Sequence, residues 1–91
     1  MYVETRPFVE KDDVRILFAN VDPELLTWHQ DGENREVEVL NQCVGWSYQS
    51  EFDIQPRQLK AGTIIKIFAS EWHRVIKTDD ATDLVLKIKR C

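Results

Sequence analysis

Hydrophobic and polar residues alternate along most of the chain, and alternation with a period of two residues predicts short β-strands. The pattern is clearest near the C-terminus, where Leu84, Leu86 and Ile88 would share one face of a strand. About seven short strands with turns between them predict an all-β sandwich or barrel. The predicted strands cover residues 14–19, 25–31, 36–40, 45–49, 63–69, 72–77 and 83–89.

Two segments depart from this pattern. Residues 50–61 contain Pro56 and have no clear period, so we expect a loop that crosses to the next strand. Residues 22–24, Asp-Pro-Glu, favour a turn, because proline presets φ for the first central position of a turn. Since proline also suits the first position of a helix, residues 22–26 can instead form one helical turn.

The length of 91 residues indicates a single domain. We divide it into an N-terminal arm with the first strand, residues 1–24, and a barrel core, residues 25–89. A hydrophobic fraction of 43% and nine aromatic residues are sufficient for a core. A domain of this size buries only about 60–65% of the surface that its unfolded chain exposes. Dimerisation is a common remedy for such a thin stability margin, and a homodimer is therefore expected.

Charge and cysteine content indicate which partners and which cellular compartment to expect for the protein. The net charge of −4 comes from 16 acidic and 12 basic residues spread along the chain, which disfavours nucleic-acid binding. We find no signal peptide and no apolar run near the ~20 residues that a membrane span needs. The two cysteines, Cys43 and Cys91, fit a reducing compartment better than a disulfide framework. A cytoplasmic location is expected, with Cys43 packed as a small hydrophobic residue.

The two histidines carry the candidate chemistry, and each follows a tryptophan, as Trp28-His29 and Trp72-His73. His29 and Asp31 are two residues apart, so in an extended segment their side chains point the same way. If strand pairing brings His73 beside them, the set becomes two imidazoles and one carboxylate. That is the ligand composition of the facial triad in non-haem iron enzymes, and it also suits Mn, Ni and Zn.

Residues 62–73, Gly-Thr-x4-Phe-Ala-Ser-Glu-Trp-His, resemble the second sequence motif of the cupin family, with His73 at the position of its metal-binding histidine. Upstream, His29-Gln30-Asp31 is similar to the cupin His-x-His pair, and residues 39–40 to the apolar dipeptide that follows it. The resemblance covers roughly residues 25–89 and extends to small single-domain cupin-like proteins of bacteria and phages. It implies a small double-stranded β-helix, or jelly-roll, barrel with a divalent metal ion inside.

The chain departs from the cupin pattern at several positions. Ser70 stands where the motif has a turn glycine, so the turn must be built differently. Asp31 replaces the second histidine, which keeps a ligand and makes it anionic. Arg35 occupies the position of the metal-binding glutamate and cannot ligate a cation. Glu36 or Glu38 can take the glutamate's place only through a register shift or a β-bulge.

Three interpretations of this cluster are open at this point. In the first, His29, Asp31 and His73 hold a divalent Fe, Mn, Ni or Zn ion. Arg35 or Gln49 then orients a small anionic metabolite, as in an oxygenase or an isomerase. In the second, Arg35 pairs with Asp31 without a metal, and the protein is a non-catalytic module that binds a small ligand or another protein. In the third, the cluster is a polar network that only stabilises the barrel.

The remaining expectations concern which side chains face inward. Trp28 and Trp72 should point away from their histidine neighbours and face outward, against a second copy of the chain or under the N-terminal segment. Trp46 and Tyr48 share one face and are expected in the core. If Gln49 lies on the inner face instead, it can donate a hydrogen bond to a ligand. Arg74 should point outward into a surface salt bridge.

Overall fold

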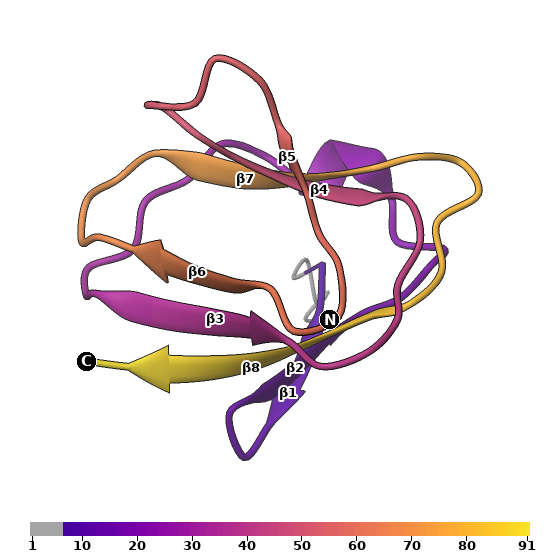
Figure 1. The fold of residues 1–91 in the computed structure, drawn as a ribbon, viewed down its shortest axis with the longest axis horizontal. Coiled ribbons are helices and arrows are strands. Elements are labelled where there is room, and N and C mark those ends of the chain that lie inside the picture. The colour runs from indigo at the N-terminus through magenta and orange to yellow at the C-terminus, as the bar shows by residue number, and fades with distance from the viewer. Residues whose placement is uncertain (1–6) are drawn as a thin grey trace, which may run out of the picture.

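The computed structural model describes residues 7–91 and consists of two antiparallel β-sheets that face each other (Figure 1). The larger sheet has the strand order β1-β2-β8-β3-β6, with bounds Val9–Lys11, Val14–Leu17, Leu84–Arg90, Arg35–Val39 and Ile64–Ile67. The smaller sheet has the order β5-β4-β7, with bounds Arg57–Gln58, Trp46–Ser50 and His73–Lys77. A short 3-10 helix, η1, covers Pro23–Leu25.

The core lies between the sheets, and the period-two pattern accounts for it. On β4, Trp46 and Tyr48 are buried while the residues beside them are half-buried, as predicted. On β8, Leu84, Leu86 and Ile88 are all buried, which confirms the shared face expected for this strand. The inward positions of both sheets therefore supply one continuous hydrophobic core.

Six of the seven predicted strands form close to their expected bounds, and the prediction for residues 25–31 is wrong. The chain instead makes the 3-10 turn Pro23–Leu25, whose N-cap Asp22 accepts a hydrogen bond from the amide of Glu24 at 2.9 Å. From this segment only His29 joins a strand, through an isolated bridge to the start of β7. The fixed φ of proline and the capping carboxylate favour the helical turn over an extended segment.

The sequence prediction also missed a hairpin at the N-terminus. Asp12 and Asp13 have φ values of 54° and 64°, so β1 and β2 are joined by a two-residue turn with both central residues left-handed. The hairpin joins the larger sheet because β2 pairs with β8. Aspartate tolerates left-handed backbone better than most residues, which allows this turn without glycine. The short strand β5 was likewise missed within the expected loop 50–61. The first six residues of the predicted N-terminal arm lie outside the described residues.

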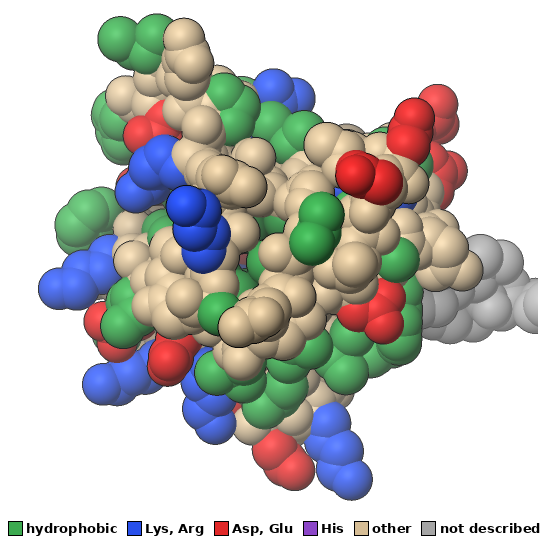
Figure 2. Space-filling model, turned by 45° about the vertical axis from the view of Figure 1, so that its right-hand side comes forward, with side chains coloured by type: hydrophobic (Ala, Val, Ile, Leu, Met, Phe, Trp, Pro, Cys, Tyr) green, Lys and Arg blue, Asp and Glu red, His purple; other side chains and the backbone are tan. Residues whose placement is uncertain are grey.

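The surface carries charges of both signs. Figure 2 shows acidic and basic side chains interspersed among hydrophobic ones on one face of the molecule. Interspersed charges of this kind limit the field that the face presents to a charged partner. Among residues 7–91, no helix is long and apolar enough to cross a lipid bilayer.

Candidate functional site

The two histidines are brought together by backbone hydrogen bonds. His29 and His73 exchange N–H···O=C bonds of 3.0 Å in both directions, and their ring centroids lie 4.2 Å apart. His73 is the first residue of β7, and His29 lies on the segment that follows η1. The structure therefore brings His73 beside His29, as the sequence analysis proposed. The two residues pair through one isolated β-bridge and not through two full strands.

The turn before β7 holds the loop that carries the third member of the cluster. Ser70 occupies the turn-glycine position with a left-handed φ of 66°. Its amide donates to the carbonyl of Asp31 at 2.8 Å, and the Gln30 side-chain amide donates back to the Ser70 carbonyl at 2.8 Å. This turn and the Asp31 loop are thus locked together. Serine thus occupies the turn position that the motif assigns to glycine. A left-handed backbone at a residue with a Cβ costs a modest amount of conformational energy.

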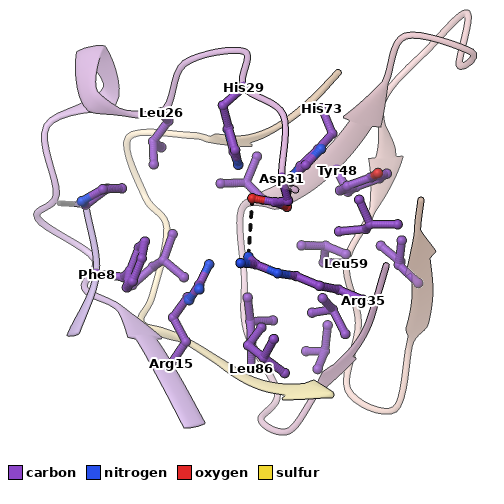
Figure 3. Close-up of a pocket in the computed structure, with 18 of the residues that line it drawn as sticks. Phe8, Arg15, Leu26, His29, Asp31, Arg35, Tyr48, Leu59, His73 and Leu86 are labelled. Carbon is purple, nitrogen blue, oxygen red and sulfur yellow. Dashed lines mark ion pairs between the residues drawn. The ribbon is translucent and has the colours of Figure 1, made fainter. Parts of the chain in front are cut away.

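His29, Asp31 and His73 converge as predicted (Figure 3). One possible ligand atom from each residue lies within 4.8 Å of the others, and Asp31 Oδ2 lies 3.1 Å from His73 Nε2. His73 is buried and Asp31 nearly so, whereas His29 is exposed. The cluster therefore sits at the rim of the space between the sheets, with one ligand reachable from solvent.

Backbone carbonyls determine the tautomer of both rings. His29 Nδ1 lies 2.9 Å from the carbonyl oxygen of Thr27, and His73 Nδ1 lies 2.8 Å from that of Glu71. A carbonyl oxygen only accepts, so Nδ1 carries the hydrogen in each ring. In the neutral rings Nε2 then keeps its lone pair. A histidine held by a carbonyl at one nitrogen and bare at the other is the usual state of a metal ligand.

The electrostatics of the cluster favour a cation. Burial is the main cause that lowers the pKa of His73, and the neighbouring His29 lowers it further while Asp31 acts in the opposite direction, so the net shift favours the neutral ring. Asp31 Oδ2 is buried and makes no hydrogen bond among the described residues, although His73 Nε2 is close by. With His73 in its neutral form and the hydrogen on Nδ1, the lone pair of Nε2 faces the carboxylate oxygen of Asp31 at 3.1 Å. A divalent ion bound by both atoms would remove this repulsion, so the residues present fit a metal ion.

Arg35 contacts the cluster without blocking it. Its Nη1 lies 3.3 Å from Asp31 Oδ1, while Nε and Nη2 both lie 3.3 Å from Glu33 Oε1. The Arg35–Asp31 pair of the second interpretation is therefore present. It uses Oδ1 of the carboxylate, whereas Oδ2 faces His73. The pair and a metal ion do not compete for the same oxygen, and Arg35 holds the carboxylate in place.

Contrary to the sequence prediction, two of the proposed ligand-binding residues do not line the cavity. Glu38 is exposed on the outer side of β3, between the buried Val37 and Val39. Pairing along β3 is regular, so no bulge or register shift turns this glutamate inward. Gln49 lies on the outer side of β4, where its carbonyl oxygen accepts from Arg74 at 3.0 and 3.3 Å. In both strands the buried neighbours occupy the inner face, which leaves these polar residues outside.

The two tryptophans that precede the histidines point away from the cluster. Trp28 is 39% exposed and Trp72 is 44% exposed, which confirms their predicted direction. Arg74 points outward as expected, but its contacts differ from the predicted salt bridge. Besides Gln49, its guanidinium lies 4.7 Å from the centroid of the Trp28 ring, a cation–π distance.

Tyr48 and Glu71 belong to the site and were not predicted as such. The Tyr48 ring stacks near His73, with centroids 6.1 Å apart, and its hydroxyl donates to Glu71 Oε2 at 2.8 Å. Glu71 is buried. The core position of Tyr48 followed from the period-two pattern, but its partner lies in another part of the chain. Tyr48 and Glu71 therefore pack beside the His73 ring.

The hydroxyl of Tyr48 is expected to resist ionisation at alkaline pH. Burial is the main cause that raises its pKa above the usual value of 10, and the bond to Glu71 and the charge of Glu71 add to the effect. The folded state therefore keeps a proton that the unfolded state releases, so the free energy of unfolding should fall as pH rises above about 10. Tyr2 is the other tyrosine in the chain. In a Tyr2→Phe variant, phenolate absorbance should appear only as the protein unfolds. A normal titration of the folded variant near pH 10 would contradict the buried Tyr48–Glu71 contact.

A cavity of about 250 Å³ opens beside the cluster. Its walls are mostly aliphatic, with residues such as Leu26, Leu59 and Leu86, and its polar lining includes the cluster and Arg35 (Figure 3). Arg15 from β2 also lines the cavity and was missed by the sequence prediction. The alternation Arg15–Leu17 could have placed it on the inner face, since Leu17 is buried two residues later.

Comparisons with known proteins identify the fold. No protein-family model and no curated protein sequence matches the chain. Among solved structures, the protein NMB1881 from Neisseria meningitidis is similar, with a TM-score of 0.54 and 14% identity, over 92% of this chain and 81% of the other. The Drosophila melanogaster CENP-C cupin domain has a TM-score of 0.52 and 14% identity, over 92% and 74% of the two chains. Drosophila melanogaster CENP-C bound to CAL1 has the same TM-score and identity, over 92% and 80%.

These similarities concern the fold, because sequence identity is low throughout. They agree with the two facing antiparallel sheets and with the motif resemblance of residues 62–73. The narrower likeness to bacterial and phage proteins stays a prediction. The chain has a small, nearly all-β, cupin-like fold that brings His29, Asp31 and His73 together.

Proposed function

We propose that this protein binds a divalent metal ion through His29, Asp31 and His73, and that the ion acts on a small anionic metabolite in the adjoining cavity. One observation carries the proposal. The buried Oδ2 of Asp31 lies 3.1 Å from Nε2 of His73 and lacks a hydrogen bond among the described residues. A buried carboxylate oxygen without a hydrogen-bond donor costs about 1–3 kcal/mol, and a cation bound to it would offset this cost.

The donor set determines which ions fit. Two imidazole nitrogens and one carboxylate oxygen suit Fe, Mn, Ni and Zn as divalent ions, and a bound ion of this class supplies Lewis-acid or oxygen chemistry. Three protein ligands leave coordination positions for a substrate or water. The protein's own residues hold the ligands in place: the carbonyls of Thr27 and Glu71 orient the two rings, and Arg35 orients Asp31.

The proposed reaction class is that of an oxygenase or an isomerase. Both classes need an open metal position next to a space that holds the substrate. The cavity of about 250 Å³ lies beside His29, Asp31 and His73 and is largely apolar, so it limits the access of water to bound substrate. Its volume is below the range of about 300–1,000 Å³ that is typical of drug-sized ligands, which favours a small metabolite.

The proposal predicts near-stoichiometric metal in the protein as purified. The protein should be prepared without an affinity tag or a chelator and submitted to elemental analysis. Melting curves are then recorded with Fe(II), Mn(II), Ni(II) and Zn(II). A free ion at 100 times its dissociation constant should add about 2.7 kcal/mol to the free energy of unfolding, which raises the melting temperature by about 10–20 °C. Absence of both metal and any melting shift would reject the proposal.

The alternative function is a metal-free binding module. Drosophila melanogaster CENP-C, which is similar to this chain in fold, is bound to another protein, CAL1. This chain exposes Trp28, Trp72 and Phe52, and 76% of the surface of Phe52 is accessible. In this alternative, the outward aromatic side chains contact a second copy of the chain in a homodimer, and the cavity only holds a ligand. The metal experiment separates the two functions, because chelators would leave the stability of a metal-free module unchanged.

A further inference from the structure

We propose that Arg15 binds the carboxylate of a small aliphatic monocarboxylic acid in the cavity, and that this binding requires the metal ion. The inference rests on the proposed metal site and names the ligand class that the site would take. Arg15 is a residue that the cupin motifs do not include, since it comes from the N-terminal hairpin.

The first argument is the position of Arg15. It lies on β2, two residues before the buried Leu17, and its side chain is 15% exposed. The guanidinium lies 3.8 Å from the centroid of the Phe8 ring, and Nη2 lies 3.1 Å from Glu10 Oε1. Phe8 and Glu10 therefore hold the side chain at the cavity. Figure 3 shows the guanidinium groups of Arg15 and Arg35 pointing into the same space.

The second argument separates the roles of the two arginines. Arg35 directs Nη1 to Asp31, and Nε and Nη2 to Glu33, so all its nitrogens face carboxylates of the chain. Arg15 directs Nε and Nη2 to a single oxygen of Glu10. Burial lowers the pKa of Arg15, and the charge of Arg35 lowers it further, which reflects two cations facing one cavity. Arg15 is therefore the arginine better placed to contact an added anion, and the net charge of the whole site decides whether an anion binds.

The third argument is the charge of the ion-pair network. Glu33 pairs with Arg35 at 3.3 Å and with Arg90 at 3.2 Å. Arg90 also pairs with Glu10 at 3.0 Å and with Asp13 at 2.8 Å. Together with Asp31 and Arg15, the network holds three guanidinium groups and four carboxylates, an excess of one negative charge. An anion is therefore disfavoured while the site is without metal. A divalent ion changes the balance to one positive charge, which a single carboxylate neutralises.

The fourth argument is the shape and polarity of the cavity. Apart from the charged groups and the histidines, the lining is mostly aliphatic and includes Leu26, Val37, Leu59, Leu86 and Ile88. A ligand therefore needs a hydrocarbon body and one anionic group. The volume of about 250 Å³ holds about eight non-hydrogen atoms if each takes about 30 Å³, the share of a water molecule in the liquid. A branched five-carbon acid such as isovalerate fits this limit.

Isothermal titration calorimetry with isovalerate tests the inference, with isovaleramide as the neutral probe of the same shape. The metal-loaded protein should bind isovalerate at least tenfold more tightly than isovaleramide, and chelator-treated protein should bind isovalerate at least tenfold more weakly than metal-loaded protein. Arg15→Gln should weaken isovalerate binding at least tenfold while metal content stays unchanged. Arg15→Lys should restore part of the affinity, because the positive charge is retained. Arg74→Gln, which removes an arginine on the outer face, is the matched control and should change nothing.

The outcomes separate this inference from the metal proposal. If the protein takes up metal but binds acid and amide equally, the carboxylate site is overturned and the metal site stands. If Arg15→Gln binds isovalerate like the wild type, Arg15 is not the anion ligand. If isovalerate binds equally with and without metal, the charge argument fails. If metal does not bind at all, elemental analysis shows this directly, and both proposals are rejected.

Discussion

A protein with His73 replaced by alanine is expected to lose its metal ion. His73 supplies the Nε2 that lies 3.1 Å from Asp31 Oδ2, and its loss leaves two of the three proposed ligands. Loss of a residue that merely supports a ligand costs about 10–100-fold in metal affinity, so loss of a ligand should cost more than about 100-fold. Elemental analysis and metal titration of the purified variant measure this effect.

Because His73 is buried, its replacement also leaves a void, and a second variant is needed to separate folding from binding. His29 is exposed, so His29→Ala should keep the melting temperature of the metal-free protein while losing metal affinity to a similar extent. Glu38→Ala removes an exposed carboxylate on the outer face of β3 and serves as the control. Metal affinity within threefold of the wild type in both histidine variants would show that the cluster is not a metal site.

The largest expected effect on stability comes from Gly45→Ala. Gly45 has a φ of +82°, and a Cβ there would lie 2.9 Å from the Cα of Ala81 and overlap the hydroxyl of Thr78. The left-handed backbone costs about 1–2 kcal/mol for a residue with a Cβ, and forced overpacking adds about 1–3 kcal/mol. The free energy of unfolding should therefore fall by about 2–5 kcal/mol. For a small domain this is a large part of the total.

The other two glycines provide matched controls. Gly62 has a φ of +85° but open space around its Cα, so Gly62→Ala should show only the backbone cost of about 1–2 kcal/mol. Gly32 has open space as well, and its φ is not in the left-handed range, so Gly32→Ala should stay within about 0.5 kcal/mol of the wild type. Urea unfolding of the three variants ranks them. Equal losses for Gly45→Ala and Gly62→Ala would show that the contact with Ala81 contributes nothing.

Some features of the site could be predicted and others could not, and the difference follows from the range of the interactions. The inward faces of β4 and β8 could be predicted, because side-chain alternation is a property of the local backbone. The same alternation should have excluded Glu38, which lies between two inward valines. The strand predicted over 25–31 does not form. Pro23 and Asp22 favour a 3-10 turn that includes Leu25, and from the remaining residues only His29 pairs, with His73.

By itself, the sequence determined the all-β class, the inner and outer faces of most strands, and the common direction of His29 and Asp31. These depend on residues within a few positions of one another. Only the tertiary structure decided that His73 meets this pair, that Arg35 takes one oxygen of Asp31 and leaves the other, and that Arg15 shares the cavity. Such contacts join segments that are distant in the chain. Strand pairing across the two sheets fixes them, and a local pattern carries no information about which distant strands pair.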